Sequence, residues 1–256
     1  TMTVKYPHLL SPVRVGGTWL RNRVIAAPTT IHSASSGQQY PTEEAIVHFA
    51  NRARAGAALV TCAGASFVPT EDDGEHASWD VYKFNSLNAL AHLAECIHFY
   101  GAKASMELGG GGMTGGGYAV SDGAPLINLQ PGREMPVEEI YRLVNCYADA
   151  AEALKSAGFD GVFLHFGHGL QVAQFLSPLT NKRTDEFGGS LENRARYPVM
   201  AVNAIRERVG RDMLIEVRIS GTEVEEGGFG REEAIAFTEM IQDKIDMIQV
   251  LSLIHI

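Results

Sequence analysis

The chain has 256 residues, of which 45% are hydrophobic and 20% charged, as is typical of a globular protein with a buried core. Its formal net charge of −9 argues against nucleic acid or an anionic membrane as a partner, because both are bound through clustered Lys and Arg. No apolar run approaches the roughly 20 residues of a membrane-spanning helix, and the first residues lack the apolar core of a signal peptide. Cys62, Cys96 and Cys146 form no C-x-x-C pair, which disfavours a zinc or iron–sulfur site and suits a reducing compartment. We therefore expect a cytoplasmic protein with a small-molecule partner, as a monomer or an oligomer.

Short apolar runs recur along the chain and predict β-strands. Runs of about four to eight apolar residues without polar alternation are typical of strands that are buried on both faces, as in parallel sheets. The expected strands are Val24–Ala27, Ala57–Thr61, Ala102–Leu108, Gly161–His165, Leu214–Ile219 and Met247–Val250.

Helical patterns lie between these runs. Thr42 is a suitable N-cap for a helix that carries acidic residues in its first turn and ends near Gly56. The clearest pattern follows Pro136 and ends at Gly158. Its apolar face consists of Ile140, Leu143, Val144, Tyr147, Ala151 and Leu154. Further helices are expected at Asn85 to Gly101, Ser190 to Val209 and Arg231 to Lys244.

The repeated order strand, helix, strand predicts right-handed βαβ units, which build either a doubly wound open sheet or a barrel. The positions of unusual polar residues favour the barrel, because the carboxyl ends of all its strands converge on one mouth. Such residues stand at or beyond the strand ends: Thr30, Cys62, Glu107, His165, Arg218 and Gln249. We expect an α/β fold of the (β/α)8 TIM-barrel class, with about six β/α units present.

A glycine cluster, Gly109–Tyr118, follows the third expected strand and formally matches the dinucleotide-binding pattern G-x-G-x-x-G. A dinucleotide site requires a helix to begin directly after the glycines, so that its N-terminal amides face the pyrophosphate. The residues that follow, AVSDGAPLINLQPG, cannot form an uninterrupted helix. We interpret the cluster as a strand-to-helix loop.

One long segment carries a family resemblance. Residues 165–194 read HFGHGLQVAQFLSPLTNKRTDEFGGSLENR. This segment resembles the signature of the Old Yellow Enzyme family, the NADH:flavin oxidoreductases with bile-acid and dienoyl-CoA reductase relatives. In that family a strand ends in His-x-x-His or His-x-x-Asn, followed by Q-F-L-S-P, N-x-R-x-D-x-[YF]-G-G-S and E-N-R. Residues 22–30 and 216–228 also resemble the family, so the resemblance covers most of the chain.

The resemblance implies a (β/α)8 barrel that binds FMN and takes its electrons from NADH or NADPH. His165 and His168 would hold a substrate carbonyl and stabilise the negative charge that its oxygen gains. The alternative that this pair binds a metal ion requires a third ligand. An iron–sulfur cluster, found in larger family members, is compatible only with a segment that follows the barrel.

Other positions match the flavin contacts of the family. Arg218 resembles the arginine beside the flavin N1–O2 edge, although a structural ion pair stays open for it. Thr30 resembles the hydroxyl that bonds to flavin O4, and Pro28, Thr29 and Gly64 would be backbone neighbours of the ring. The remaining motif residues are expected to hold their own loop together: Asn181, Arg183, Asp185 and Arg194.

The chain also departs from the family pattern. Glu107 stands where the family usually has Gln against the flavin pyrimidine, and a carboxylate accepts the N3–H but cannot donate to O2. Gly110 and Met113 replace the His and Arg of an H-x-G-R motif. Leu170 stands where many members have the tyrosine that protonates the substrate.

We therefore expect an enzyme that reduces an activated C=C bond, such as an enone or enoyl group, with Tyr118, Tyr40 or water as proton donor. The loss of the tyrosine leaves open an oxidation, such as amine or ether demethylation, within the same family. A barrel without flavin, either a non-catalytic fragment or a binder of phosphate ligands, is the alternative outside it.

The last residues, Leu251–Ile256, read LSLIHI, which resembles the translation of a transposase adaptor used in sequencing libraries. We expect native sequence over residues 1–250, forming an incomplete FMN-binding barrel, and a non-native tail at 251–256. A barrel without its last two units would lack the phosphate-binding loops and would be inactive by itself. Resequencing the locus tests this expectation, and a genuine stop codon after these codons would refute it.

Overall fold

The structure is a computed structural model that describes residues 5–29, 39–69, 78–108, 118–125 and 130–251. The chain divides into two compact units, each assembled from separate segments. Unit 1 comprises Thr1–Leu108, Ala150–Phe163 and Val209–Leu214. Unit 2 comprises Gly109–Asp149, Leu164–Arg208 and Ile215–Ile256.

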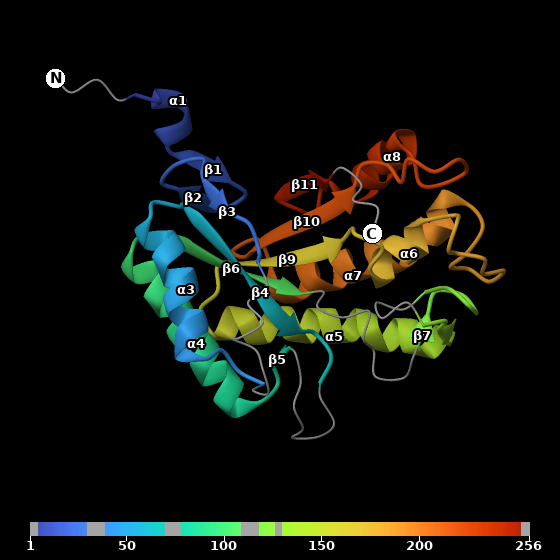
Figure 1. The fold of residues 1–256 in the computed structure, drawn as a ribbon, viewed down its shortest axis with the longest axis horizontal. Helices are drawn as coiled ribbons and strands as arrows, with labels where there is room; N and C mark the ends of the chain where they lie inside the picture. Colours follow the sequence, from blue (N-terminus) through green and yellow to red (C-terminus); the bar gives the residue numbers. More distant parts are fainter. Residues whose placement is uncertain (1–4, 30–38, 70–77, 109–117, 126–129, 252–256) are drawn as a thin grey trace. The chain divides into compact units, whose positions relative to one another are not determined.

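Unit 1 is built on the parallel strands β3 (Ile25–Ala26), β4 (Leu59–Ser66) and β6 (Lys103–Leu108), with β4 in the middle. Helix α3 (Glu43–Arg54) packs on β4, α4 (Phe84–Phe99) packs on β6, and the two helices lie side by side (Figure 1). The residues of β4 and β6 are mostly buried, which explains their continuous apolar runs.

The starts of the strands are joined one to the next by backbone hydrogen bonds of 2.8 Å. Within unit 1 the bonds run Ala58 N–H to Val24 O, Lys103 N–H to Ala58 O, Asp160 N–H to Ala104 O and Leu214 N–H to Asp160 O. The last two bonds attach β9 (Gly161–Phe166) and β10 (Leu214–Ser220), both of which begin in unit 1. The sheet therefore has the order β11-β10-β9-β6-β4-β3, in which the main strands follow their order along the chain.

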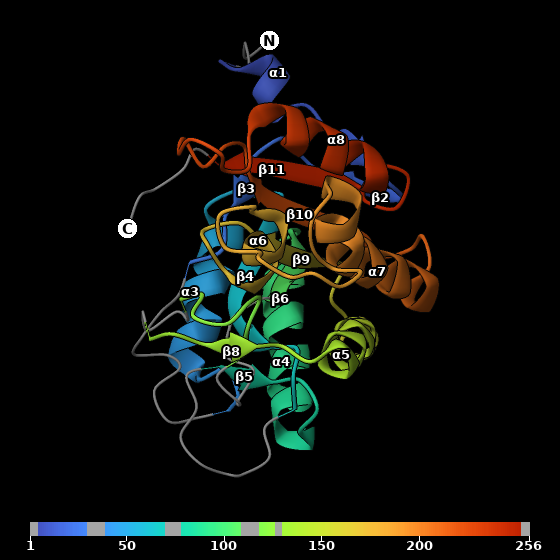
Figure 2. The same ribbon diagram turned by 90° about the vertical axis from the view of Figure 1, so that its right-hand side faces the viewer.

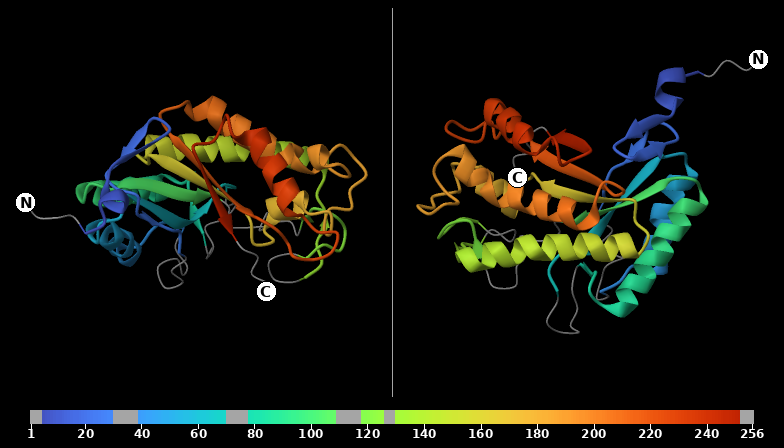
Figure 3. Two further views of the ribbon diagram at one scale, coloured as in Figure 1. Left: turned by 90° about the horizontal axis from the view of Figure 1, so that it is seen from above. Right: turned by 180° about the vertical axis from the view of Figure 1, so that it is seen from behind.

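Unit 2 contains the pairing of β10 with β11 (Met247–Leu251), which is parallel and places Arg218 directly opposite Gln249. Helices α6 (Gln171–Leu176) and α7 (Leu191–Val209) follow β9, and α8 (Arg231–Ile241) precedes β11 (Figures 2 and 3). The short strands β7 (Tyr118–Ala119) and β8 (Arg133–Glu134) form a separate parallel pair. Helix α5 (Val137–Ser156) connects β8 to β9.

Two aspartates repeat one arrangement at the start of strands two places apart in the sheet. Asp160, before β9, donates its N–H to Ala104 O and accepts the Ala104 N–H at Oδ2, 2.9 Å away. Asp246, before β11, forms the same pair of bonds with Ile215, each 2.9 Å long. A cation neutralises each carboxylate, Lys103 at 2.8 Å for Asp160 and Arg206 at 2.6 Å for Asp246. Each aspartate thus fixes the start of its strand against the preceding strand.

The six predicted strands and five predicted helices are present within a few residues of their expected bounds. Thr42 caps α3 by accepting the Ala45 N–H at 3.3 Å, and the predicted apolar face of α5 is buried. The prediction for α8 was wrong at its end, because the helix stops at Ile241 and residues 242–244 form a turn.

Several short elements were not predicted. They are α1 (Pro7–Leu10), the antiparallel hairpin of β1 (Val13–Val15) and β2 (Thr18–Leu20), β5 (Trp79–Asp80), β7, β8 and α6. The glycine cluster up to residue 117 lies outside the described residues. In the part of the chain that the structure describes, none of the helices is both long and apolar enough to cross a membrane.

Candidate active site

Two histidines at the end of β9 lie in direct contact within unit 2. His165 is in the strand and 7% exposed, whereas His168 is exposed in the turn that follows. His165 Nε2 lies 3.0 Å from His168 Nδ1, and the ring centroids are 4.8 Å apart. The structure therefore brings together the two residues that were predicted from the sequence to hold the substrate carbonyl.

The backbone of the turn makes this contact possible. His168 has φ = 57°, in the left-handed region that non-glycine residues rarely occupy, and Gly169 has φ = 66°. The N–H of Gly167 donates to His165 Nδ1 at 3.2 Å, and the N–H of Leu170 closes the turn on Gly167 O. Strained conformations of this kind cluster at functional sites, because surrounding structure must maintain them.

The surroundings keep both imidazoles neutral. Burial lowers the pKa of His165 to about 3, with further lowering by the positive charge of Arg218 and by the charge that His168 would carry if it were protonated. Burial and then Arg218 also lower the pKa of His168. At neutral pH each ring therefore carries one N–H and one acceptor nitrogen.

Arg218 supplies a buried positive charge to the same region of unit 2. Its side chain belongs to β10 and the residue is 8% exposed. The guanidinium donates to Gln249 Oε1 on β11, with distances of 2.9 Å from Nη2 and 3.3 Å from Nε. The carboxamide is neutral, so this contact holds the guanidinium in place without adding a charge. Sequence analysis noted Gln249 only as a strand-end polar residue, since no motif indicated its partner.

The other predicted flavin contacts that the structure describes lie in unit 1. Gly64 sits at an irregularity in the pairing of β4 with β6 and has φ = 125°. A Cβ atom there would make an ordinary contact of 3.5 Å with the Trp79 ring, so it is the backbone conformation that favours glycine. Glu107 is half-buried in β6, and Thr29, which is exposed, donates to Ala27 O at 3.4 Å.

Three predictions need separate mention. Pro28 is half-buried beyond the end of β3, whereas Thr30 lies outside the described residues. Cys62 was wrongly placed at a strand end: it lies inside β4, is fully buried, and its thiol pKa is raised by that burial. Leu170 precedes α6 as its N-cap residue and makes no side-chain capping bond.

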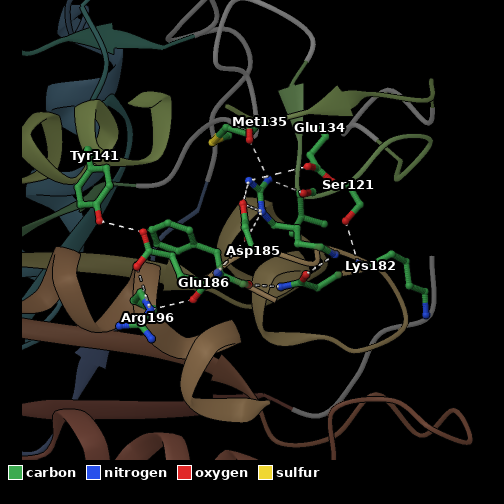
Figure 4. Close-up of polar contacts among 12 residues, drawn as sticks. Ser121, Glu134, Met135, Tyr141, Lys182, Asp185, Glu186 and Arg196 are labelled. Atoms are coloured by element: carbon green, nitrogen blue, oxygen red, sulfur yellow. Dashed lines mark hydrogen bonds and ion pairs between the residues drawn. The ribbon is translucent and has the colours of Figure 1, made fainter. Parts of the chain in front are cut away.

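The long loop after α6 is held by backbone-directed hydrogen bonds within unit 2. The buried guanidinium of Arg183 donates to Val120 O at 3.0 Å, to Met135 O at 2.7 Å and to Asp185 at 2.6 Å. Asn181 donates to Phe175 O and Phe187 O. Around this centre, Figure 4 shows Lys182 bound to Ser121 and Tyr141 linked through Glu186 to Arg196. These contacts hold the loop together, which is the structural role that was expected for the motif residues.

One link across the loops of unit 2 was missed. Glu223 accepts the Ser177 hydroxyl at 2.7 Å and the Phe229 N–H at 2.6 Å, joining the loop after β10 to the end of α6. Sequence spacing cannot reveal such a link, because the partners are 46 residues apart along the chain. Among the described residues, no group of three or more His, Cys, Asp or Glu side chains could hold a metal ion.

The residues present suit an anionic flavin ligand. In unit 2 the buried Arg218 cation, bound to a neutral amide and flanked by neutral histidines, favours a ligand that carries or develops negative charge. In unit 1 Gly64 is half-buried in the carboxyl half of β4, where its φ of 125° favours glycine.

Comparison with known proteins gives relatives for nearly the whole chain. It is 31% identical over 247 residues to the NADH oxidase of Thermoanaerobacter brockii, covering 93% of this chain and 38% of that protein. It is 30% identical to the NADPH dehydrogenase of Listeria welshimeri, covering 94% of this chain and 72% of that protein. The chain thus spans well under half the length of the first of these relatives.

The fold agrees with these relationships. The structure of the Old Yellow Enzyme from Pichia sp. AKU4542 matches over 95% of this chain and 70% of that one, with a TM-score of 0.81 and 24% identity. This match confirms the expected fold class, a TIM barrel of the Old Yellow Enzyme type with part of its β/α units present. Residues 8–256 match the model of the NADH:flavin oxidoreductase / NADH oxidase family, and the chain belongs to that family.

Proposed function

We propose that the protein to which this chain belongs is an FMN-dependent enzyme that reduces an activated C=C bond of a small enone or enoyl-type substrate, with NADH or NADPH as reductant. Family membership supports a flavin-dependent oxidoreductase. The observation that carries the finer proposal is the neutral pair His165–His168 beside the buried cation of Arg218. Neutral N–H donors next to a fixed positive charge stabilise the negative charge that develops on a substrate oxygen.

Each site residue has a proposed task. The histidine pair binds the substrate carbonyl, and Arg218 holds the N1–O2 edge of the flavin. Pro28, Thr29, Thr30 and Gly64 would contact the ring system, and Glu107 would accept the N3–H of its pyrimidine. FMN, when bound, supplies the exchange of hydride between nicotinamide and substrate. An iron–sulfur cluster is proposed only for segments beyond this chain.

Leu170 motivates a second candidate function. A leucine cannot donate a proton, so reduction at this site needs the proton from another group or from water. Oxidation of an amine or ether by the same flavin needs no such donor. An oxidative dehydrogenase or demethylase is therefore the alternative to the ene-reductase.

The absorption spectrum of the product of the whole gene, with this chain alone for comparison, tests the proposal. We expect flavin bands that NADH or NADPH bleaches without oxygen and that an enone such as 2-cyclohexenone restores. If no enone restores the flavin bands, and an N-methylamine bleaches them instead, the oxidative alternative is favoured. A folded, colourless whole-gene product that takes up no added FMN would refute both functions.

A further inference from the structure

Two fully buried hydroxyl groups lie on adjacent strands of unit 1. Thr61 on β4 and Ser105 on β6 are Cα partners in the parallel pairing of these strands, and each residue is 0% exposed. In the part of the chain that the structure describes, neither Thr61 Oγ1 nor Ser105 Oγ has a hydrogen-bond partner. Most buried hydroxyl groups in proteins do have a partner, because an unpaired one raises the free energy of the folded state.

Both side chains are on the face of the sheet that is opposite helix α3. The next residue of β4, Cys62, faces that helix, which packs on β4: burial raises the pKa of its thiol, and the nearby charge of Arg52 on α3 opposes the rise. Successive residues of a strand point to opposite faces, so Thr61 points away from α3. Ser105 is the partner of Thr61 on β6 and shares its face.

The next strand offers no side chain as a partner for these hydroxyls. The position of β9 beside Ser105 is Gly161, where an added Cβ atom would lie 3.3 Å from Ser105 Oγ and 3.0 Å from Leu214 Cβ. Any side chain at this position would meet those atoms, which explains why glycine stands there. A partner for the hydroxyls is therefore a molecule smaller than a side chain.

The spacing of the strands suits one bridging molecule. Neighbouring strands of a sheet lie about 4.8 Å apart, whereas a direct hydrogen bond between two hydroxyls requires about 2.8 Å. A water molecule that makes two hydrogen bonds of this length, at its tetrahedral angle, joins oxygen atoms that are roughly 4.5 Å apart. One water therefore spans the distance between paired residues of β4 and β6.

A neutral molecule suits this place better than an ion. Both hydroxyls are uncharged, and a buried ion without a partner of opposite charge is strongly disfavoured. Water is small, and it donates as well as accepts hydrogen bonds. Waters buried in proteins typically bind polar groups that would otherwise lack a partner.

We propose that Thr61 and Ser105 bind one buried water molecule, which bridges β4 and β6 on the face of the sheet opposite α3. The water is a structural part of unit 1, because it satisfies two hydroxyls that the strand pairing holds apart. This site also explains why two polar residues interrupt the apolar runs of these strands. The inference goes beyond the proposed function and does not depend on flavin or substrate.

A high-resolution crystal structure of the product of the whole gene tests the site directly. We expect electron density for one water within about 3 Å of both Thr61 Oγ1 and Ser105 Oγ. Thr61→Val removes one hydroxyl at nearly constant shape and should remove this density, whereas Thr61→Ser keeps the hydroxyl and should retain it. Absence of the density in the unmodified protein, or a direct hydrogen bond between the two hydroxyls, would overturn the proposal.

Urea unfolding of the same protein tests the energetic contribution of the water. If the water binds both hydroxyls, Thr61→Val and Ser105→Ala each remove a buried hydrogen bond, and each should lower the urea concentration at the midpoint of unfolding. If the hydroxyls have no partner, their removal relieves a desolvation cost and raises the midpoint instead. A raised midpoint in either single variant would therefore contradict the proposal.

A double variant tests whether the two residues share one water. The midpoint should fall less in Thr61→Val with Ser105→Ala than the sum of the single falls, because the first substitution already weakens the binding of the water. Thr238→Val is the matched control, since the Thr238 hydroxyl donates to Ala234 O at 2.7 Å. Its effect should add to that of Ser105→Ala. Additive effects in both pairs would show that Thr61 and Ser105 do not share a ligand.

Discussion

His165 shows how strongly its neighbours determine the chemistry of a side chain. Its ring is neutral because burial removes solvent and because Arg218 places a positive charge nearby. The sequence predicted His165, His168 and Arg218 as a group, since each stands at or just after the end of a buried strand. It could not predict that the two rings lie in direct contact, because that depends on the left-handed backbone at His168, which no motif encodes.

A change of charge at Gln249 should shift the pKa values of both histidines. Gln249→Glu would place a carboxylate at hydrogen-bonding distance from the Arg218 guanidinium and offset its charge. We expect the pKa values of His165 and His168 to rise, by roughly one unit or more. Gln249→Met is the matched control, because it removes the acceptor without adding charge. NMR titration of the histidine rings measures the effect, and equal pKa values in both variants would contradict it.

At the scale of elements, hydrophobic periodicity predicted well wherever burial alone decides the structure. The strands β4, β6, β9 and β10 are buried on both faces and were all found from apolar runs. The pair β7–β8 was missed because each strand has two residues, too few for any pattern. The end of α8 was missed because residues 242–244 leave the helix as a turn before β11, without a glycine or proline to mark the stop.

The stability of the loop after α6 should depend on one arginine. Arg183 has a side chain only 2% exposed and binds two carbonyl oxygens as well as Asp185. Arg183→Ala leaves these buried acceptors without their donor, so we expect a loss of about 3–5 kcal/mol in the free energy of unfolding, measured with urea.

Arg196 offers a matched control for Arg183 within the same network (Figure 4). Its side chain is 40% exposed and lies 4.0 Å from the Glu186 carboxylate. Arg196→Ala should cost less than about 1 kcal/mol, because exposed ion pairs contribute little. Equal losses for the two variants would show that burial of Arg183 does not determine its contribution.

For the whole molecule, the lowered pKa of the histidines predicts sensitivity to mild acid. In the unfolded chain His165 takes up a proton near its ordinary pKa of 6.5, whereas in the folded chain it does so only near 3. The unfolded state therefore binds more protons between these values, and the free energy of unfolding falls as the pH is lowered from 6.5. The lowered pKa of His168 acts in the same direction.

The expected slope from His165 is up to about 1.4 kcal/mol per pH unit. Urea unfolding at pH 7 and at pH 5 measures it in a range where most carboxylates stay charged. His165→Gln should flatten the dependence. A stability that stays level between these two pH values in the unmodified chain would contradict the prediction.

The whole-molecule fold class was predictable because many weak patterns agree, whereas the geometry at the strand ends depends on single contacts. The family resemblance of residues 165–194 identified the loop motif, but only the three-dimensional structure shows that Arg183 donates to backbone carbonyls while His168 is exposed. The substrate is the least predictable property, since relatives that match this chain over more than nine-tenths of its length bear different names, NADH oxidase and NADPH dehydrogenase.

The paired aspartates Asp160 and Asp246 have a consequence for how such a protein can change. Each one locks the alignment of two strands at their amino ends, and a slip of one residue would turn every side chain to the opposite face. Arg218 meets Gln249 only because the alignment of β10 with β11 is kept. Insertions and replacements in the loops at the carboxyl ends can then accumulate without disturbing that alignment. We infer that these aspartates keep the scaffold constant while the loops that determine specificity vary. A new activity can then evolve through changes in one loop at a time.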